Sequence, residues 1–327
     1  MLSDIFAPVT PQLEMVHRAL AASLRLEGIT DPTRPVLTYV LGSRGKQLRA
    51  ALVLIPTLGE KAADSGDRSR RAIQAGTAVE LIHLATLLHD DVLDEAGERR
   101  GRPTLSVLWG NKNSILAGDY FFARAFGILA EINCPALLNL FTSAIATTCA
   151  GEIEEHQDSY NMEISEENYL QRIGKKTASL FAACARAGGL LAGKGREEQA
   201  ALERFGYNLG IAFQLTDDLL DIIGDPNQLG KPVGQDLLQG VYTLPVLVAL
   251  AEPATGKRLR RILARGLDRN NLEEIRSLVA NSQGREATRQ MALEYKTRAL
   301  RELQALPPGP VRDNLARMAQ FVVERIF

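Results

Sequence analysis

The sequence predicts an all-α protein, and three features of the chain support that prediction. No segment keeps the apolar–polar alternation of a half-buried strand, whereas apolar residues recur at helical spacing in most of the chain. Short clusters of Gly, Pro, Asn and Asp separate these segments, as turns between helices require. Two long apolar stretches end in the same acidic pattern, Asp-Asp-x-x-Asp. We therefore expect one large domain, residues 1–327, built as a bundle of about ten or more helices.

The expected helices follow one another along the chain. An amphipathic helix over 11–26 ends near Gly28, and a turn at 31–35 precedes an apolar helix over 48–58. Residues 72–94 are apolar on nearly every side, which is typical of a helix buried all round. A charged loop over 95–103 follows. Later helices are expected over 114–129, 132–151, 166–191, 196–223 and 311–325, with a loop at 224–240 and a proline-rich break at 306–310.

Composition and charge exclude several classes of protein. The chain is 46% hydrophobic and 24% charged with a net charge of −1, so no global positive charge favours nucleic-acid binding. No secretory signal is visible at the start. Residues 132–151 are uncharged, but their Asn, Pro, Ser and Thr content favours a buried core helix over a membrane span. Cys134, Cys149 and Cys184 have no metal-type spacing, so we expect small buried side chains in a soluble, cytoplasmic protein.

Each acidic motif places three carboxylates at the end of an apolar helix, at residues 90–94 and 217–221. Carboxylates at a helix C-terminus oppose the helix dipole and repel one another, so such an end is less stable than it could be. Bound divalent metal is the simplest compensation, and two such ends facing each other would hold a cluster of it. Oxygen donors without His or Cys at ligand spacing favour Mg²⁺ with substrate phosphates. One such end could be a solvated cap, but two copies make that interpretation weak.

Basic residues stand near both motifs. Arg and Lys side chains in glycine-containing loops fit phosphate groups, although any one of them alone is as well explained as a solvated surface cation. Together, acids that bind metal and bases that bind phosphate imply a diphosphate substrate, and the apolar helices imply a long hydrocarbon tail on it. The bases are Arg99, Arg100 and Arg102 after the first motif, Lys231 after the second, and Lys46, Arg49, Lys175 and Lys176 in other helical stretches.

The chain resembles the trans-isoprenyl diphosphate synthases, the polyprenyl synthetase family, over about residues 45–245. This resemblance implies the isoprenoid synthase fold, with helices around a central cavity, and a long-chain, all-trans polyprenyl diphosphate synthase. The motifs that carry it are Gly45-Lys46-Gln47-Leu48-Arg49, His83, the two acidic motifs, Arg99-Arg100-Gly101, Lys176-Thr177, Gln214 just before the second motif, and Gly230-Lys231-Pro232-Val233-Gly234-Gln235-Asp236.

The resemblance implies a role for each motif residue. Up to three Mg²⁺ would be ligated by Asp90, Asp94 and Asp217, with Asp91, Asp218 and Asp221 supporting them. The allylic diphosphate would be held by Arg99, Lys176, Thr177, Gln214 and Lys231, and Gln214 and Thr177 would also lie near the developing allylic cation. Isopentenyl diphosphate would be held by Lys46, Arg49, His83 and Arg100. Without the resemblance, His83 would read as a core histidine.

The implied reaction is sequential head-to-tail condensation of isopentenyl diphosphate onto an allylic diphosphate such as farnesyl diphosphate, for a quinone side chain. The allylic C–O bond ionises as diphosphate leaves, the isopentenyl double bond attacks the cation, and a proton is lost. Apolar helix walls would keep water from the cation. The resemblance also implies a homodimer. A heteromer with a small subunit, and a peripheral membrane contact for product release, remain open.

Product length should depend on what blocks the cavity one turn below the first motif. Thr86 and Ala85 lie there, where short-chain members carry bulky aromatic residues, so we expect a long product, with Phe141 as a candidate floor. Two positions depart from the usual pattern of the family. Val241 stands where lysine is common, which removes one diphosphate contact, and Ala50 stands where proline usually follows Arg49.

Several alternatives remain beside the long-chain synthase. Within the family they are a shorter-chain geranylgeranyl or farnesyl synthase and the catalytic subunit of a heteromeric synthase. A terpene cyclase would carry Asn, Ser and Glu in its second motif, and a non-catalytic subunit would lack several of the six aspartates. A metal-dependent phosphohydrolase is suggested by His89-Asp90, but the chain has no second His-Asp pair among its four histidines.

Overall fold

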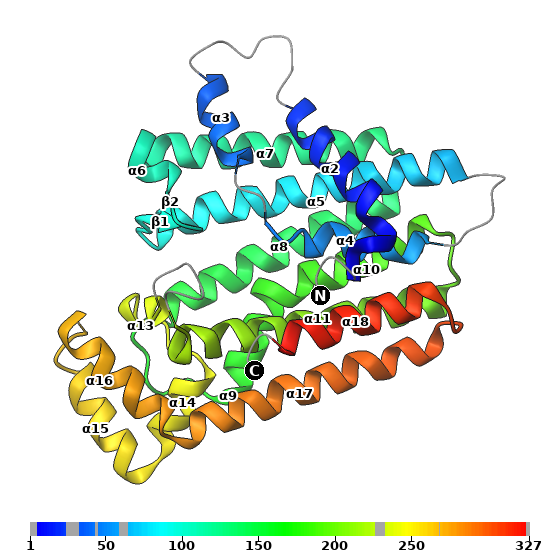
Figure 1. Cartoon of the computed structure of the whole chain (residues 1–327). Coiled ribbons are helices and arrows are strands. Elements are labelled where there is room, and N and C mark those ends of the chain that lie inside the picture. The colour runs from blue at the N-terminus through cyan, green and yellow to red at the C-terminus, as the bar shows by residue number, and fades with distance from the viewer. Residues whose placement is uncertain are drawn as a thin grey trace. The chain divides into compact units, whose positions relative to one another are not determined.

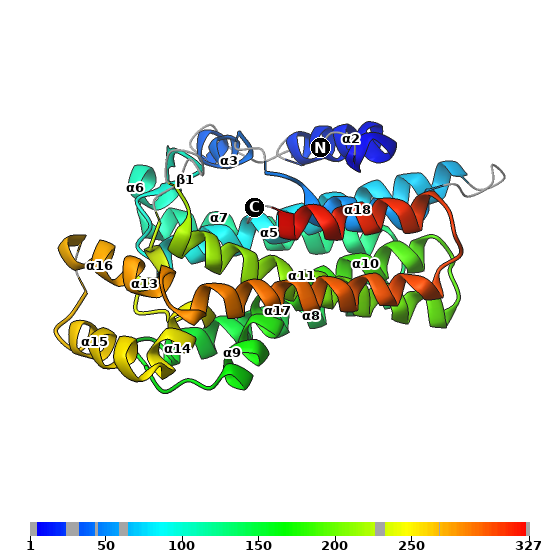
Figure 2. The same cartoon turned by 60° about the horizontal axis from the view of Figure 1, so that its bottom comes forward.

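The computed structural model describes residues 5–23, 33–42, 45–58, 65–225, 233–267 and 269–324. Within these ranges the chain is almost wholly helical, so the all-α prediction is confirmed (Figures 1 and 2). A two-stranded hairpin is the one sheet that they contain. Residues 24–26 of the first expected helix, and the basic residue Lys231, lie outside the described residues.

The elements succeed one another with short connections. The first group is η1 (Ala7–Val9), α2 (Thr10–Ala22), α3 (Thr33–Leu41), α4 (Leu48–Leu54), η2 (Ile55–Thr57), α5 (Ser65–Leu93), β1 (Glu98–Arg99), β2 (Arg102–Pro103), α6 (Leu105–Trp109), α7 (Asn111–Glu131) and α8 (Pro135–Gln157). The second is α9 (Glu166–Ile173), η3 (Gly174–Ala178), α10 (Ser179–Leu191), α11 (Arg196–Ile223), α13 (Gln235–Leu238), α14 (Leu244–Ala251), α15 (Pro253–Leu263), α16 (Arg269–Ala280), α17 (Gln283–Glu302), η4 (Leu303–Ala305) and α18 (Pro310–Glu324).

The helices form two compact units, each built from segments that are far apart in the sequence. Unit 1 comprises Met1–Ile145, Ala183–Glu203 and Ala305–Arg317. Unit 2 comprises Ala146–Ala182, Arg204–Gln304 and Met318–Phe327. The first acidic motif belongs to unit 1 and the second to unit 2. A single domain over residues 1–327 stays a prediction.

Helix α5 is the centre of unit 1. It packs along α7 and also contacts α2 and α4. Every residue from 75 to 82 is buried, so neighbours cover every side of this part of the helix, as predicted, whereas most residues from 83 to 94 are only partly buried or exposed. The polar residues before position 72 extend the helix back to Ser65, further than the apolar pattern predicts.

Unit 2 has its own apolar core. Helix α14 packs against α15, α16 and α17, and its residues Leu244, Val246 and Leu250 are buried there. The predicted helix over 166–191 is interrupted: α9 leads into one turn of π-helix, η3, before α10 begins. Such turns are uncommon and occur often at functional sites.

Helix α8 differs from its predicted character. It has a buried stripe at Leu137, Phe141, Ala144 and Thr148, but only 22% of its most apolar window is buried, so the prediction of a core helix is wrong. Its other face exposes small or uncharged side chains, among them Thr142, Ala146 and Cys149. By length and composition alone, α8 is long and apolar enough to cross a membrane. The prediction of buried cysteines is also wrong at Cys149, which is exposed on this helix.

Candidate active site

Helix α5 delivers the first acidic motif at its C-terminus. Asp90 and Asp91 are its last aspartates, and Asp94 follows in a turn whose backbone N–H donates to the Asp90 carbonyl oxygen at 2.8 Å. Asp91 is 4% exposed, whereas Asp90 and Asp94 are each partly exposed. Since Asp90 and Asp94 are one turn apart, they share a face of the helix, and Asp91 lies about 100° round its axis.

A tight hairpin holds an arginine against this motif. Arg100 and Gly101 form its two-residue loop with φ of 55° and 70°, and these positive values are those of a hairpin turn of type I′. The turn places Arg99 so that its Nε donates to Asp91 Oδ1 at 2.5 Å. Burial raises the pKa of Asp91, and the Arg99 guanidinium opposes that rise. The sequence predicted only a charged loop here.

Three of the residues predicted to hold isopentenyl diphosphate come together in unit 1. Arg49 Nη1 donates to His83 Nε2 at 3.2 Å, which requires a neutral imidazole with its proton on Nδ1. Burial lowers the pKa of His83 well below its usual value, and the guanidiniums of Arg49 and Arg100 lower it further. Arg100 lies against Gly45, where an added Cβ would come within 2.8 Å of its Nη2. Lys46 follows Gly45 directly and is exposed, so its place in the cluster stays a prediction.

A buried carboxylate, which the sequence analysis missed, lies beside this cluster. Glu80 is 7% exposed, and its Oε1 accepts the Ala50 backbone N–H at 3.1 Å. Burial raises the pKa of Glu80, while Arg49 and Arg100 lower it. A single glutamate within an otherwise apolar helical run was the available signal, because such a group needs cationic or hydrogen-bonding partners.

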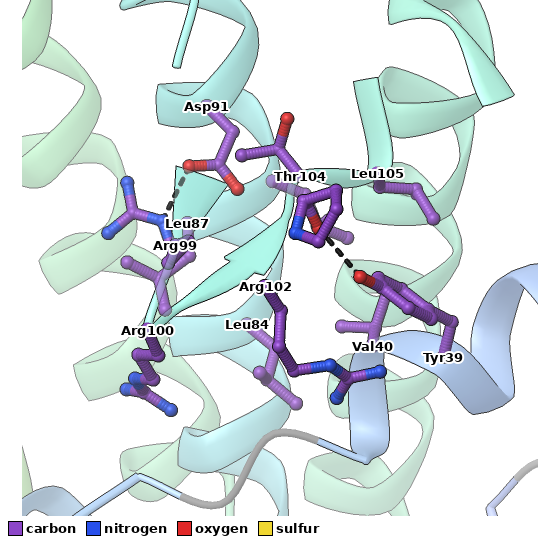
Figure 3. Close-up of a pocket in the computed structure, with 12 residues that line it drawn as sticks. Tyr39, Val40, Leu84, Leu87, Asp91, Arg99, Arg100, Arg102, Thr104 and Leu105 are labelled. Atoms are coloured by element: carbon purple, nitrogen blue, oxygen red, sulfur yellow. Dashed lines mark hydrogen bonds and ion pairs between the residues drawn. The ribbon is translucent and has the colours of Figure 1, made fainter. Parts of the chain in front are cut away.

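A pocket adjoins the hairpin on the side of α3. It encloses about 480 Å³ of empty space, its open mouth included. Figure 3 shows the guanidinium of Arg102 next to the ring of Tyr39, 4.2 Å from its centroid. Asp91, Arg99 and Arg100 line the pocket, so it adjoins the predicted diphosphate-binding residues of unit 1. The lining residues are Tyr39, Val40, Leu84, Leu87, Leu88, Asp91, Arg99, Arg100, Arg102, Pro103, Thr104 and Leu105.

The second acidic motif ends α11 in unit 2, and a chain of hydrogen bonds fixes its middle aspartate. Asp218 is 2% exposed and accepts from the Tyr169 hydroxyl and, at 2.7 Å, from Gln214 Nε2. Thr177 Oγ1 donates to Gln214 Oε1 at 2.7 Å. Burial raises the pKa of Asp218 to about 7. The structure therefore joins three predicted residues, Thr177, Gln214 and Asp218, and adds Tyr169.

Lys176 is held by acids from α8. Its ammonium lies 2.9 Å from Glu152 Oε1 and 2.5 Å from Glu155 Oε1. Glu155 also approaches the guanidinium of Arg172 at 3.7 Å, and Asp158 lies 3.3 Å from it. Arg172 is 2% exposed, so this is a buried ion-pair network. The sequence analysis assigned no role to Glu152, Glu155 or Arg172, because charged residues at ordinary helical spacing look like a solvated face.

Close helix packing positions the π-helical turn that carries Lys176 and Thr177. An added Cβ at Gly151 of α8 would lie 2.5 Å from the Lys176 backbone nitrogen. On the other side, an added Cβ at Gly210 of α11 would lie 2.5 Å from Ala178 Cα. Glycine at these two positions lets α8 and α11 approach the turn closely, which brings Thr177 within reach of Gln214.

Asp221 closes the second motif and organises the segment that follows it. Its carboxylate oxygens lie 3.3 Å from the backbone nitrogens of Gln235 and Asp236, at the start of α13. It is 5% exposed. Burial, with Asp221 nearby, raises the pKa of Asp236 well above its usual value. Val241, where the family often has lysine, donates its backbone N–H to the Asp236 carbonyl oxygen at 2.8 Å.

The six aspartates fit Mg²⁺ by their chemistry. All are hard oxygen donors, and within either unit the described residues bring no group of three His, Cys, Asp or Glu side chains together as a ready-made metal site. Mg²⁺ does not need one, because it binds through one or two carboxylates, waters and substrate phosphates. Three aspartates, Asp91, Asp218 and Asp221, are buried and accept hydrogen bonds from the protein, whereas Asp90, Asp94 and Asp217 are each partly exposed.

The residues predicted to set product length all lie in unit 1. Ala85 and Phe141 are fully buried at 0% exposure. Thr86 is partly exposed, one turn before Asp90, with its Oγ1 donating to the His83 carbonyl oxygen at 2.9 Å. Their control of length stays a prediction.

Comparisons with known proteins identify relatives over nearly the whole chain. A family model described as polyprenyl synthetase matches residues 31–281. The chain is 37% identical to heptaprenyl diphosphate synthase component 2 of Bacillus subtilis (strain 168), over 96% of this chain and 88% of that protein. It is 36% identical to a short chain isoprenyl diphosphate synthase of Methanothermobacter thermautotrophicus, over 91% and 93% of the two chains. A solved polyprenyl synthase from Caulobacter crescentus CB15, complexed with calcium and isoprenyl diphosphate, gives a TM-score of 0.91 at 31% identity, covering 99% of this chain and 97% of its own.

Proposed function

Because this chain belongs to the polyprenyl synthetase family, we propose that it is a long-chain, Mg²⁺-dependent polyprenyl diphosphate synthase. As a family member it has the isoprenoid synthase fold and is a prenyltransferase that makes polyprenyl diphosphates. The proposal concerns its metal, its substrates and the length of its product. The substrates are isopentenyl diphosphate and an allylic diphosphate such as farnesyl diphosphate.

One observation supports the metal assignment above the others. The three partly exposed aspartates, Asp90, Asp94 and Asp217, are those proposed to ligate Mg²⁺. The other three are buried and hydrogen-bonded within their own units, which suits supporting positions. When bound, Mg²⁺ would neutralise the diphosphate as it leaves. The relative from Caulobacter crescentus, solved with calcium and isoprenyl diphosphate, binds the same combination of divalent cation and diphosphate.

The basic residues divide between the two diphosphates. Arg49, Arg100 and Lys46, with neutral His83 accepting from Arg49, form the proposed site for isopentenyl diphosphate. Arg99 and Lys176 would hold the allylic diphosphate, and each is already fixed by acids, Arg99 by Asp91 and Lys176 by two glutamates. Such prior ordering lowers the entropy lost when a ligand binds. Lys231 is assigned to the same group and stays a prediction.

Product length is proposed from the first motif. Thr86 and Ala85 are small, so their side chains would not block a chain that grows past this turn of α5. Relatives named for heptaprenyl and for short-chain products are about equally similar to this chain, so similarity alone does not choose between them. A shorter-chain synthase is therefore the alternative, and the destination of the product in a quinone side chain stays a prediction.

We propose a homodimer for the assembly. Helix α8 exposes Thr142, Ala146, Cys149 and Ile153 on one face, and Ile153 is 59% exposed. An uncharged face of this kind is costly to leave in water and suits a second copy of the chain. The relative from Bacillus subtilis is named as component 2, so a small partner subunit is the alternative. Light scattering on wild type and Ala146→Glu tests this proposal. We expect a dimeric wild type and a monomeric variant, and a monomeric wild type would contradict the proposal. Cys134, Cys149 and Cys184 form no disulfide, which suits a reducing compartment such as the cytoplasm.

The metal assignment is tested by titrating Mg²⁺ against condensation activity in aspartate variants. Asp90→Asn and Asp217→Asn are expected to raise the Mg²⁺ concentration for half-maximal activity far more than Asp119→Asn, an exposed carboxyl on α7. Unchanged Mg²⁺ dependence in both motif variants would reject the proposed ligands.

A further inference from the structure

A short stretch of unit 2 is strongly basic in a chain that is nearly neutral overall. Residues 253–269 contain six Lys or Arg residues and one acid, Asp268, so their net charge is +5. Because the whole chain has a net charge of −1, the remaining residues together carry −6. The charge of this stretch is therefore local and opposite in sign to the rest of the molecule.

Packing explains only part of this charge. Helix α15 buries Leu259 and Leu263 against its neighbours. Arg258 pairs with Glu274 of α16 at 2.6 Å, and Arg260 pairs with Glu163, just before α9. These two arginines attach α15 to the rest of unit 2.

Three other cations form a row on the outer side of this segment, which we call the basic stripe: Lys257, Arg261 and Arg265. They are spaced four residues apart, so Lys257 and Arg261 lie on one face of α15 and Arg265 continues that line after the helix ends. All three are exposed. Among the described residues, none of the ion pairs involves them. Like charges at this spacing repel one another, so the stripe costs the isolated helix some stability.

We infer that the basic stripe docks the enzyme on an anionic lipid surface. The six Lys or Arg residues of 253–269 fall in the range of about four to eight that is typical of amphipathic helices in contact with acidic lipid headgroups, and the three of the basic stripe are those that make no ion pair within the described residues. A protein partner would need apolar or aromatic anchors at the centre of the interface. None of the exposed large apolar side chains of the described residues lies on α15 or α16. The inference rests on the proposed function in one respect: a long-chain polyprenyl diphosphate is itself a lipid, so a membrane is its natural destination.

The stripe belongs to the same end of unit 2 as the second acidic motif. Helix α15 packs against α16, and Arg276 of α16 donates to the carbonyl oxygens of Ile222 and Gly224, at 2.9 Å and 3.0 Å. These two residues directly follow the motif at the end of α11. Figures 1 and 2 show α13, α15 and α16 gathered at this end of the unit. A lipid surface bound by the stripe would therefore lie near the second acidic motif, which is proposed to bind the diphosphate through metal.

The test is co-sedimentation of the full-length protein with vesicles of phosphatidylcholine, with and without phosphatidylserine. Three proteins are compared: wild type, the stripe variant Lys257→Gln/Arg261→Gln/Arg265→Gln, and the matched control Arg18→Gln/Arg196→Gln/Arg317→Gln. The control removes three exposed cations from α2, α11 and α18, so both variants lose the same net charge. Each cation near an acidic surface is worth about fivefold in binding, so the stripe variant should bind about a hundredfold more weakly. The control should stay close to wild type, and added salt should weaken all binding.

Two results would overturn the inference. One is a stripe variant that binds acidic vesicles as tightly as wild type. The other is a wild type that binds polyglutamate but not acidic vesicles, which would assign the stripe to an acidic polypeptide. Condensation activity with soluble substrates is measured separately and is expected to be unchanged in the stripe variant. Vesicle binding without any condensation would reject the proposed function and leave the lipid contact standing.

Discussion

Replacing Asp218 by asparagine is expected to stabilise the metal-free protein above neutral pH while removing its activity. Burial raises the pKa of this carboxyl from 3.8 to about 7. A carboxyl whose pKa is higher in the folded than in the unfolded chain stabilises the fold fully below pH 3.8. This contribution to the free energy of unfolding is lost as the pH rises to about 7. Each pKa unit corresponds to about 1.36 kcal/mol, so ionised Asp218 costs the folded state about 4 kcal/mol.

The amide keeps part of the hydrogen bonding around this position. The Tyr169 hydroxyl can donate to an asparagine oxygen as it donates to Asp218. Gln214 Nε2, now 2.7 Å from a carboxylate oxygen, would face an amide N–H₂ group instead. A lost hydrogen bond of this kind costs about 1 kcal/mol. The expected net gain in the free energy of unfolding is therefore about 3 kcal/mol above neutral pH.

Urea denaturation in EDTA measures this gain. Wild type, Asp218→Asn and the control Asp119→Asn are compared at about pH 8 and about pH 4, on either side of the titration. The Asp218 variant should be the most stable of the three at the higher pH and should lose that advantage at the lower one. The control, a carboxyl that is 62% exposed, should change stability by less than about 0.5 kcal/mol. An Asp218→Asn protein no more stable than wild type at the higher pH would refute the reasoning.

Three further predictions follow from packing and charge. Thr86→Phe and Ala85→Phe should shorten the product, and unchanged product length on chromatography would reject this reasoning. Thr86→Phe should disturb the fold less, because Thr86 is partly exposed whereas Ala85 is fully buried. Arg172→Met should destabilise the protein by about 1–3 kcal/mol in denaturation, because Asp158 loses a charged hydrogen-bond partner and Glu155 keeps only Lys176. A near-wild-type value would contradict the network. Gly151→Ala should lower condensation activity and reduce the free energy of unfolding by about 1–3 kcal/mol, since its methyl group meets the Lys176 backbone. The matched control is Gly127→Ala, whose methyl group meets nothing within 4 Å, and it should show neither loss.

The sequence was a good guide to the helices and to the family, whereas the roles of the residues in the two motifs stay predictions. Helix periodicity identified α5 and α11, because each is long and ends at an acidic pattern that no apolar core explains. The six aspartates, Lys176, Thr177 and Gln214 were all identified before any geometry. Within unit 2 the structure then joined Thr177, Gln214 and Asp218 by hydrogen bonds.

Other features left little trace in the sequence. The hairpin has strands of two residues each, too short to show alternation. The π-helical turn depends on how closely Gly151 and Gly210 let other helices approach, which a local pattern cannot show. Glu80, Tyr169 and Arg172 are buried polar residues whose partners come from elsewhere in the chain. The burial of helix α8 was predicted wrongly, because composition alone does not show whether neighbouring helices cover its small uncharged residues.

The most direct test of the proposed function is the product formed from farnesyl diphosphate and labelled isopentenyl diphosphate. Purified protein is incubated with Mg²⁺ or with EDTA, and the extracted product is separated by chain length. The proposal predicts label in a product longer than geranylgeranyl diphosphate, formed only with Mg²⁺. A product no longer than geranylgeranyl diphosphate would contradict the long-chain assignment. Release of phosphate from farnesyl diphosphate without any incorporation of label would contradict the synthase itself.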